Sequence, residues 1–312
     1  MANRRPRLFT FASGGWVLAV AVGLSIAGVA WNLAPLFSPD RVRPRGDGRN
    51  PASYGFDLAH AIVPPERIAS SGLVADALRA LDDPATWSLA EIQGRYLVGD
   101  DKVIGVVFGG EARAYPLRVL VWHEVVNDVV AGVPIAVTYN AVSHGIAVFD
   151  RRAGGGTLTF RVSGLLYQSN LLMYDRQGES LWSQLQARAI AGPAAGTSLT
   201  VLPLSLSRWD AWSAAWPQTR VLAPLAAERE KYSRDLSGSF AGSEALRFPV
   251  DPMPPPGRPL KTVVFAPLEG EVVPLEVAPG ERRLEVRGRS GTVPEAGLYA
   301  FWFAWYATRP AP

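Results

Sequence analysis

Between residues 103 and 202 the sequence alternates short apolar runs with glycine-containing or polar turns, and this alternation most constrains the fold. Runs of this length are typical of β-strands, because a helix of a globular protein usually needs a longer periodic segment. Strands are predicted at residues 103–108, 112–115, 134–139, 146–150, 158–162, 171–175 and 198–202, and again at 263–265, 272–277 and 284–286. Together with only a few helices, these strands predict an α+β fold that is β-dominated.

Two segments outside the strands have apolar residues at helical spacing. Residues 70–81 precede a run of two aspartates and a proline, which ends helices, and they are predicted to form one helix. Residues 207–216 are predicted to form another, with Trp209, Trp212 and Trp216 along one stripe. We interpret this stripe as core packing and not as a cofactor site.

A third helix is predicted from Pro116 to about Val130. Proline is favourable at the first position of a helix, and Gly132 would end the segment. The aromatic run at residues 301–306 is too short to span a bilayer. We expect it to dock on the body as a terminal strand or helix.

The N-terminus predicts a membrane anchor. Residues 8–37 form an uncharged apolar run that follows three arginines and is long enough to cross a hydrocarbon core of about 30 Å. A cleaved signal peptide is the alternative, because Gly28-Val29-Ala30 is an acceptable cleavage site. The sequence is therefore divided into an anchor or signal segment at 1–37, a linker at 38–53 and a single domain at 54–312. The basic residues before the run predict that this domain lies on the extracytoplasmic side, periplasmic or outer.

Composition excludes several functional classes. The protein has 312 residues and no cysteine, so disulfides, thiolate catalysis and thiolate metal sites are excluded. Its formal net charge is +3, and 31 basic residues are interspersed among 28 acidic ones. A nucleic-acid groove needs a concentrated basic face, so nucleic acid is not expected as a partner. The predicted anchor makes the membrane a partner, and a protein partner in or at the membrane fits an anchored body.

The predicted helix at 116–130 carries the first candidate site. On a helix, His123 and Asn127 would share one face, and Glu124 and Asp128 would share the neighbouring face. An imidazole beside carboxylates is suitable for general acid–base catalysis or for binding a divalent metal. The spacing differs from His-Glu-x-x-His, so the second ligand of a zinc protease is absent. The alternative is a hydrogen-bonded histidine next to solvated carboxylates.

The loop between the strands at 134–139 and 146–150 carries the second candidate site. Asn140, Ser143 and His144 would form a small polar group there, or the asparagine and serine would simply cap the turn. If this loop folds over the preceding helix, His144 and His123 would form a metal site with two imidazoles.

Four further residues in the later strands are pocket candidates. Tyr167 ends one predicted strand, and Asp175 and Arg176 end the next. Asp175 and Arg176 would form an ion pair or line a cleft, and Trp182 follows on the next turn. Structural roles are expected for this group before catalytic ones.

Several motifs in fixed order resemble a known family. They are Glu-Ala-Arg-Ala-Tyr-Pro-Leu (111–117), His-Glu-Val-Val-Asn-Asp (123–128), Pro-Ile-Ala-Val-Thr-Tyr (134–139), Ser-Gly-Leu-Leu-Tyr (163–167), Met-Tyr-Asp-Arg (173–176) and Glu-Ser-Leu-Trp-Ser-Gln (179–184). The chain after the linker thus resembles the bacterial and archaeal family called domain of unknown function 3179. This resemblance implies a shared fold but little about function.

The resemblance also identifies where this chain departs from the family. Members typically carry Cys-Pro-x-Cys directly after the Val-Thr-Tyr strand, which implies soft-metal binding or thiol redox chemistry in the family. Here residues 140–143 are Asn-Ala-Val-Ser, and His144 follows them. Two explanations remain open: the family's activity is lost, or a different ligand set built on His123 and His144 replaces it.

These observations support three hypotheses in order. The first is a membrane-anchored extracytoplasmic protein with a binding or assembly role and a degenerate site. The second is a metal-binding protein or metal-dependent enzyme that uses His123 and His144, with Glu124 and Asp128 as catalytic candidates. The third is a metal-free hydrolase with His123 as base, for which no nucleophile is recognisable in the sequence.

Overall fold

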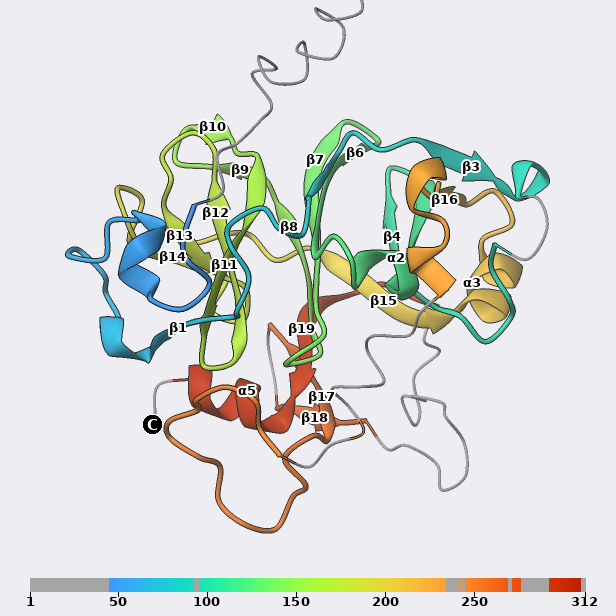
Figure 1. Ribbon diagram of the computed structural model, residues 1–312. Coiled ribbons are helices and arrows are strands. Elements are labelled where there is room, and N and C mark those ends of the chain that lie inside the picture. The colour runs from blue at the N-terminus through green and yellow to red at the C-terminus, as the bar shows by residue number, and fades with distance from the viewer. Residues whose placement is uncertain are drawn as a thin grey trace, which may run out of the picture. The chain divides into compact units, whose positions relative to one another are not determined.

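The described part of the protein is built mainly of short strands (Figure 1). The computed structural model describes residues 45–92, 96–233, 242, 245–268, 271–275 and 292–309. The predicted anchor at 1–37, the first part of the linker and the predicted strand at 284–286 lie outside these ranges. Within the ranges, no helix has the length and hydrophobicity that crossing a membrane requires. The short strands and few short helices confirm the prediction of a β-dominated α+β fold.

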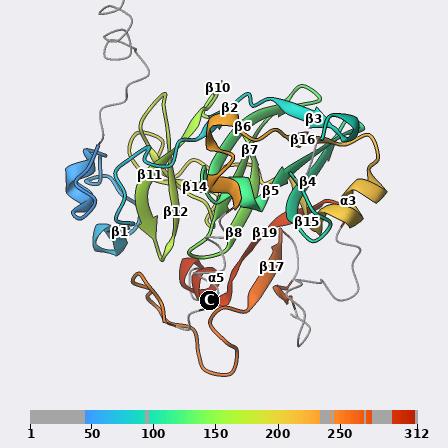
Figure 2. The same ribbon diagram turned by 45° about the vertical axis from the view of Figure 1, so that its right-hand side comes forward.

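The larger of the sheets contains twelve strands within the described residues. Ten of them follow one path, which is β2 (Leu81–Asp82), β6 (Val125–Val130), β7 (Val133–Asn140), β8 (Gly145–Asp150), β19 (Glu295–Phe301), β15 (Pro203–Arg208), β4 (Lys102–Phe108), β5 (Glu111–Pro116), β16 (Arg220–Leu222) and β3 (Thr86–Ser88). The other two are β17 (Val263–Pro267), which pairs with β19, and β18 (Val273–Pro274), which pairs with β17. Figure 2 shows β17 beside β19.

The second sheet contains five strands. They are ordered β1 (Ile68–Ser70), β11 (Phe160–Tyr167), β12 (Asn170–Asp175), β13 (Leu181–Ser183) and β14 (Arg188–Ala191). A separate two-stranded ribbon joins β9 (Arg152–Ala153) to β10 (Gly156–Thr157). Side chains from both larger sheets form one core, in which Val137 and Phe149 belong to the first sheet and Phe160 and Trp182 to the second. Burying each such side chain contributes about 1.5–3 kcal/mol, so this shared core holds the two sheets together.

Antiparallel hairpins account for most of the confirmed strands. β4 and β5 pair through a turn at Gly109 and Gly110, which have φ values of 53° and 82°. A two-residue hairpin turn needs positive φ at both positions, and glycine adopts it without a steric penalty. β11–β12 is a hairpin of the same kind, with a two-residue turn at residues 168–169. β7–β8 is a hairpin with a four-residue turn at residues 141–144.

The predicted helix at 116–130 is wrong beyond its first turn. Pro116 does precede a helix, but α2 (Leu117–Leu120) is a single turn, and residues 125–130 form β6. Glu124 has a φ of 55°, which interrupts any helix at that point. The valine-rich segment after it pairs with β7 along its whole length, because β-branched side chains pack well on a half-buried pleated surface.

The predicted helix at 70–81 is also wrong. Its backbone N–H groups bond to distant carbonyls: Ala75 donates to Arg45 at 2.8 Å and Asp76 donates to Val162 at 2.9 Å. Asp76 has a φ of 59°. Hydrogen bonds to the neighbouring strand therefore replace the local ones that a helix would make, and tertiary contacts override helical spacing.

Three predicted strands have different boundaries. Residues 198–202 do not form a strand; β15 begins at Pro203, which as a first residue needs no ladder donor. The strand predicted at 158–162 begins at Phe160 and continues to Tyr167. In the segment 272–277, the described strand is β18 alone.

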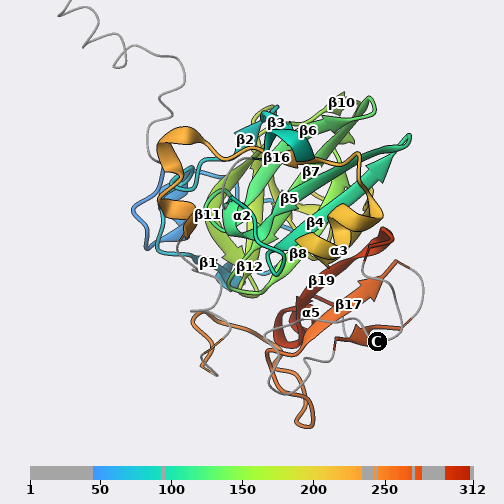
Figure 3. The same ribbon diagram turned by 90° about the vertical axis from the view of Figure 1, so that its right-hand side faces the viewer.

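Short helices complete the architecture. α3 (Trp209–Ala215) lies against β15 and β4, with Trp209 and Trp212 buried and Trp216 half-buried. Figure 3 shows α3 beside β4. The tryptophan stripe is thus core packing, as predicted. α5 (Trp302–Thr308) follows β19, and its Phe303 and Trp305 are buried in the main core, which confirms that the C-terminal aromatic run docks on the body. The 3₁₀ helices are η3 (Pro51–Tyr54), η4 (Pro65–Arg67), η5 (Leu89–Glu91), η6 (Ala226–Glu228) and η7 (Lys231–Ser233).

Candidate functional site

Two turns bring residues of the 123–128 and 134–139 motifs together at one end of β6 and β7. After α2 the chain reverses, and the Glu124 N–H donates to the Leu120 carbonyl at 2.7 Å. Glu124 then takes positive φ and leads into β6. The Tyr139 N–H, near the end of β7, donates to the Glu124 carbonyl at 2.9 Å. This backbone bond places Glu124 directly beside the turn at residues 141–144.

That turn is capped from within by Asn140. Its Oδ1 accepts from the Ser143 N–H at 3.1 Å and from the Ser143 hydroxyl at 2.8 Å. Asparagine side chains favour such local bonds, because they imitate a backbone turn. His144 follows with a φ of 49°, and Gly145 then begins β8. These bonds match the alternative in which Asn140 and Ser143 cap the turn, and His144 takes no part in them.

The polar group extends well beyond the turn. The Asn140 amide donates to Glu124 Oε1 at 2.8 Å, and the Asn170 amide donates to Ser143 Oγ at 2.8 Å and to Gln184 Oε1 at 2.7 Å. The Gln184 amide in turn donates to Thr138 Oγ1 at 2.8 Å and to the Gly145 carbonyl at 3.1 Å. We call these side chains the amide network: Glu124, Thr138, Asn140, Ser143, Asn170 and Gln184.

The amide network is buried and joins the two sheets. Asn140, Ser143, Asn170 and Gln184 are each at most 1% exposed. Gly145 is required at its centre, because an added Cβ would lie 2.2 Å from Gln184 Oε1. Buried polar groups cost free energy unless they are paired, and here each carries at least one hydrogen bond to another member. The network therefore fixes the 141–144 turn of the first sheet onto the start of β12 and the residue that follows β13 in the second.

Glu124 is the titratable member of the network. Burial raises the pKa of its carboxyl group to about 7, although the hydrogen bond from Asn140 acts in the opposite direction. A carboxyl group with a pKa of about 7 can both donate and accept a proton at neutral pH, which suits general acid–base catalysis. Glu124 as a whole residue is half-buried, so part of its surface reaches solvent.

His123 has a separate set of partners. Its Nδ1 lies 2.7 Å from the Arg79 carbonyl, which can only accept, so Nδ1 carries the proton. Its Nε2 lies 2.9 Å from the Tyr232 hydroxyl and accepts from it, with Glu228 Oε2 at 3.6 Å. Burial lowers the pKa of this imidazole. His123 thus holds the segments around Arg79 and η7 against the end of α2, and both ring nitrogens are engaged.

His144 lies between aromatic rings. Its ring stacks on Phe301 with centroids 5.3 Å apart and meets Tyr139 edge-on at 5.6 Å. Burial, with a smaller contribution from the charge of Lys102, lowers its pKa to about 3. Its Nε2 is buried and has no hydrogen-bond partner in the described structure. The low pKa keeps the imidazole neutral at physiological pH, and the aromatic rings packed against it supply no second metal ligand.

The predicted pairing of the two imidazoles in one metal site receives no geometric support. His123 contacts Arg79, Tyr232 and Glu228, whereas His144 contacts Tyr139 and Phe301. Within the described residues, no group of three or more histidine, aspartate or glutamate side chains could hold a metal ion. At the positions of the family's cysteine pair, an amide and a hydroxyl are poor ligands for soft metals and are already bonded to each other. These residues therefore do not fit the soft-metal or thiol chemistry implied by the family resemblance.

Asp128 belongs to a different cluster. Its carboxylate accepts from Arg113 at 2.7 Å and from the Tyr115 hydroxyl at 2.7 Å, and Glu111 also pairs with Arg113. Asn127 instead donates to Asp82 and to the Phe160 carbonyl. Because residues 125–130 form a strand, the predicted helical faces shared by His123 with Asn127 and by Glu124 with Asp128 are wrong.

The four pocket candidates occupy different surroundings. Asp175 accepts from the Trp182 indole at 2.8 Å and from the Ser180 N–H at 3.1 Å, so it caps the turn before β13. Trp182 lies in the core, edge-on to Phe160. Arg176 is exposed, and no ion pair with Asp175 is present among the described residues. Tyr167 lines a cavity.

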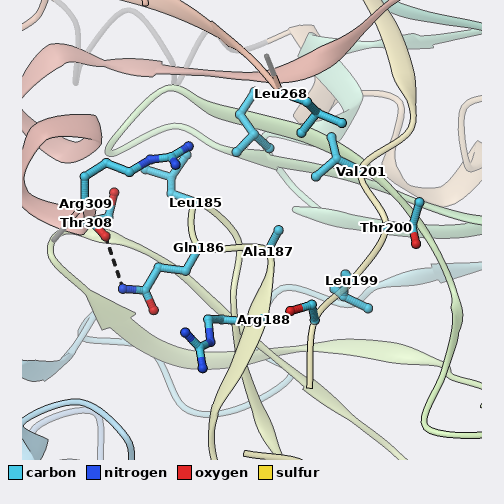
Figure 4. A pocket seen from close by; sticks show the side chains of 12 residues that line it. Leu185, Gln186, Ala187, Arg188, Leu199, Thr200, Val201, Leu268, Thr308 and Arg309 are labelled. Carbon is cyan, nitrogen blue, oxygen red and sulfur yellow. Dashed lines mark hydrogen bonds between the residues drawn. The ribbon is translucent and has the colours of Figure 1, made fainter. Parts of the chain in front are cut away.

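Two adjoining cavities lie away from the amide network, and sequence reasoning missed them. The first, of about 450 Å³, is lined by Leu185, Gln186, Ala187, Arg188, Ser198, Leu199, Thr200, Val201, Leu268, Leu298, Thr308 and Arg309. The second, of about 370 Å³, is lined by Ile62, Val63, Pro64, Arg67, Tyr167, Gln186, Arg188, Pro252, Ala307, Thr308 and Arg309. The lining residues come from segments that are distant in sequence, and no local sequence pattern predicts that these segments pack together. Figure 4 shows the first cavity, with Gln186 between Arg188 and Arg309 in this view.

Comparison with known proteins identifies one match. Residues 75–291 match the sequence model of a family described as protein of unknown function (DUF3179). This match covers more than half of the chain and includes both hairpins that carry the amide network. No curated protein and no solved structure matches the chain.

Proposed function

This chain belongs to the DUF3179 family of proteins of unknown function, and we propose that it is a membrane-anchored, extracytoplasmic binding protein. In this proposal the turn at residues 141–144 is an internal support and not a reactive centre. The uncharged run at residues 8–37, with arginines before it, supports the anchored location. The body would then present its binding surfaces on the outer side of the membrane.

The amide network carries the proposal. Asn140 and Ser143 occupy the positions where the resemblance implies a cysteine pair. Both side chains are hydrogen-bonded to neighbouring side chains inside the protein. A reactive centre needs groups that face a substrate, whereas these bonds connect two sheets. Loss of the family's chemistry at this position would leave a framework whose remaining use is binding.

Stability and metal content test the role of the turn. Replacing Ser143 by alanine removes two buried hydrogen bonds, and we expect the free energy of unfolding to fall by about 1–3 kcal/mol. Ser213→Ala is the matched control, because the Ser213 hydroxyl makes one exposed bond. The full chain, exposed to zinc and copper and then dialysed, should retain no stoichiometric metal. One equivalent that disappears in both His123→Ala and His144→Ala would replace this proposal with the metal-binding alternative.

The location is tested separately. Cells that express the full chain are fractionated, and the intact cells or spheroplasts are treated with protease. We expect the chain in the membrane fraction with its body digested from outside. A soluble chain of full length, or a body protected from external protease, would contradict the anchored extracytoplasmic location.

A second candidate function is acid–base catalysis by Glu124. The observation in its favour is the raised pKa of the Glu124 carboxyl group, about 7. A buried carboxyl group destabilises the protein at neutral pH, and such a destabilising group is typical of catalytic sites. Glu124→Gln preserves the acceptor that Asn140 needs while removing the titration. An enzymatic activity of the wild type that is lost in Glu124→Gln would support this candidate, and an activity that the variant keeps in full would exclude a catalytic role for the carboxyl group, whatever its effect on stability.

A further inference from the structure

The two cavities meet at one cationic wall. Gln186, Arg188, Thr308 and Arg309 line both of them, and Arg67 lines the second. No aspartate or glutamate is among the described residues that line either cavity. Arg188 and Arg309, which line both cavities without a lining carboxylate, create a positive potential there that attracts anions.

Arg188 has one N–H group at this wall that lacks a hydrogen-bond partner among the described residues. It lies at the start of β14, and its Nε is buried without a hydrogen-bond partner in the described structure. No ion pair joins its guanidinium to a carboxylate of the described residues. A buried N–H without a partner costs about 1–3 kcal/mol, and an anionic oxygen in the cavity would satisfy it.

Arg309 is held in place without a carboxylate. Its guanidinium stacks on the Trp305 ring, with 3.7 Å between its central carbon and the ring centroid. Partial burial lowers the pKa of this group, although the residue as a whole is exposed at the edge of the cavity. Arg67 differs, because it pairs with Asp251 at 2.6 Å. Arg188 and Arg309 are therefore the two cations available to a ligand.

The rest of the first cavity is apolar. Leu199, Val201 and Leu298 are each at most 8% exposed, and Leu268, which is 58% exposed, lies where the wall reaches the surface. A volume of about 450 Å³ is within the range of small-molecule sites, which combine an apolar lining with a few polar groups. The lining therefore matches a ligand with an apolar body and one anionic end.

We propose that the joined cavities bind a small aliphatic carboxylate, whose carboxylate group lies between Arg188 and Arg309. Its apolar chain lies along Leu199, Val201 and Leu298. Guanidinium groups recognise carboxylates through paired, charge-assisted hydrogen bonds, and Gln186 contributes a further polar side chain from the same wall. This ligand class rests on the proposed binding function and gives it a site.

The test measures hexanoate binding to the full chain in lipid nanodiscs. Hexanoate labelled with ¹³C at the carboxyl group is titrated at pH 8 and followed by NMR, with empty nanodiscs subtracted. Unlabelled acetate and hexan-1-ol are added as competitors, because one lacks the chain and the other lacks the charge. The variants are Arg188→Gln and Arg309→Gln, and Arg49→Gln, at an exposed arginine outside both linings, is the control.

We expect saturable hexanoate binding that weakens roughly tenfold or more in Arg188→Gln and in Arg309→Gln, and stays unchanged in Arg49→Gln. Acetate and hexan-1-ol should each compete at least about tenfold more weakly than unlabelled hexanoate. Absence of saturable binding, unchanged affinity in both cavity variants, or equal competition by hexan-1-ol would overturn the proposal. These results do not bear on the role of the 141–144 turn, because that role is tested by stability and metal content. Conversely, retained metal would overturn the proposed function without changing the measured hexanoate affinity.

Discussion

Two buried titratable groups beside the 141–144 turn should oppose each other in the pH dependence of stability. His144 has a native pKa of about 3 and Glu124 has a native pKa of about 7, whereas the ordinary values are 6.5 and 4.5. Each shift links protonation to folding, because the native and unfolded states then bind different numbers of protons. The two contributions to the pH dependence of stability have opposite signs and nearly cancel in the wild-type protein. A variant that removes one of the two groups reveals the contribution of the other.

For His144 the native state resists protonation. As the pH falls below 6.5, the unfolded chain takes up a proton that the native protein does not, so stability is lost progressively down to pH 3. Between pH 7.5 and pH 5.0 this loss amounts to about 2 kcal/mol. Removing the imidazole removes the loss, and His144→Asn is suitable because asparagine tolerates the positive φ at this position.

For Glu124 the native state resists ionisation. Its contribution is fully present below pH 4.5 and is lost as the pH rises through 7, so acidification from pH 7.5 to pH 5.0 should stabilise the protein by at most about 2.4 kcal/mol. Glu124→Gln keeps the hydrogen bond from Asn140 and abolishes this gain. At pH 7.5 the same variant should be more stable than the wild type, because it avoids the buried carboxylate.

The assay is urea unfolding of the full chain, followed by tryptophan fluorescence, at pH 7.5 and pH 5.0. We define the pH response as the free energy of unfolding at pH 5.0 minus that at pH 7.5. Relative to the wild type, this response should rise by about 2 kcal/mol in His144→Asn and fall by about 2 kcal/mol in Glu124→Gln. The control is His60→Asn, since the His60 side chain is exposed. Equal responses in the wild type and both variants would refute the reasoning.

Three further predictions use the same unfolding assay at pH 7.5. Arg113→Met leaves the Asp128 carboxylate buried without its cation and should cost about 3–5 kcal/mol; a cost below 1 kcal/mol would show that the pair is not desolvated. Gly145→Ala forces a Cβ against Gln184 and should cost about 1–3 kcal/mol, whereas a neutral effect would mean that the amide network is loosely packed. Tyr232→Phe removes the donor to His123 Nε2 and should cost about 1 kcal/mol, and no change would exclude that bond.

Strands were predicted well where local patterns and turns agreed. The hairpin of β4 and β5 followed from an apolar run and a Gly109-Gly110 turn, both of which lie within a few residues. The helix after Pro116 failed because the valines of residues 125–130 have a partner strand that local spacing does not reveal. Hydrogen bonds to that strand outweigh a weak helical preference.

The candidate site was predicted only in part for the same reason. Asn140 and Ser143 are close in sequence, so their mutual bonds in the turn could be expected. Their connection to Asn170 and Gln184 requires two sheets to meet, and no spacing within one segment encodes that contact. The arginine-lined cavities depend on the same kind of long-range assembly.

A double-mutant cycle on Ser143 and Asn170 tests the central claim, that the 141–144 turn is an internal support tied to the second sheet. The free energies of unfolding of the wild type, Ser143→Ala, Asn170→Ala and the double variant give the coupling between the two side chains, whose bond is 2.8 Å long. Directly bonded, buried residues couple by about 0.5–3 kcal/mol, and the account predicts a value in that range. Additive losses, with a coupling energy of zero, would contradict it.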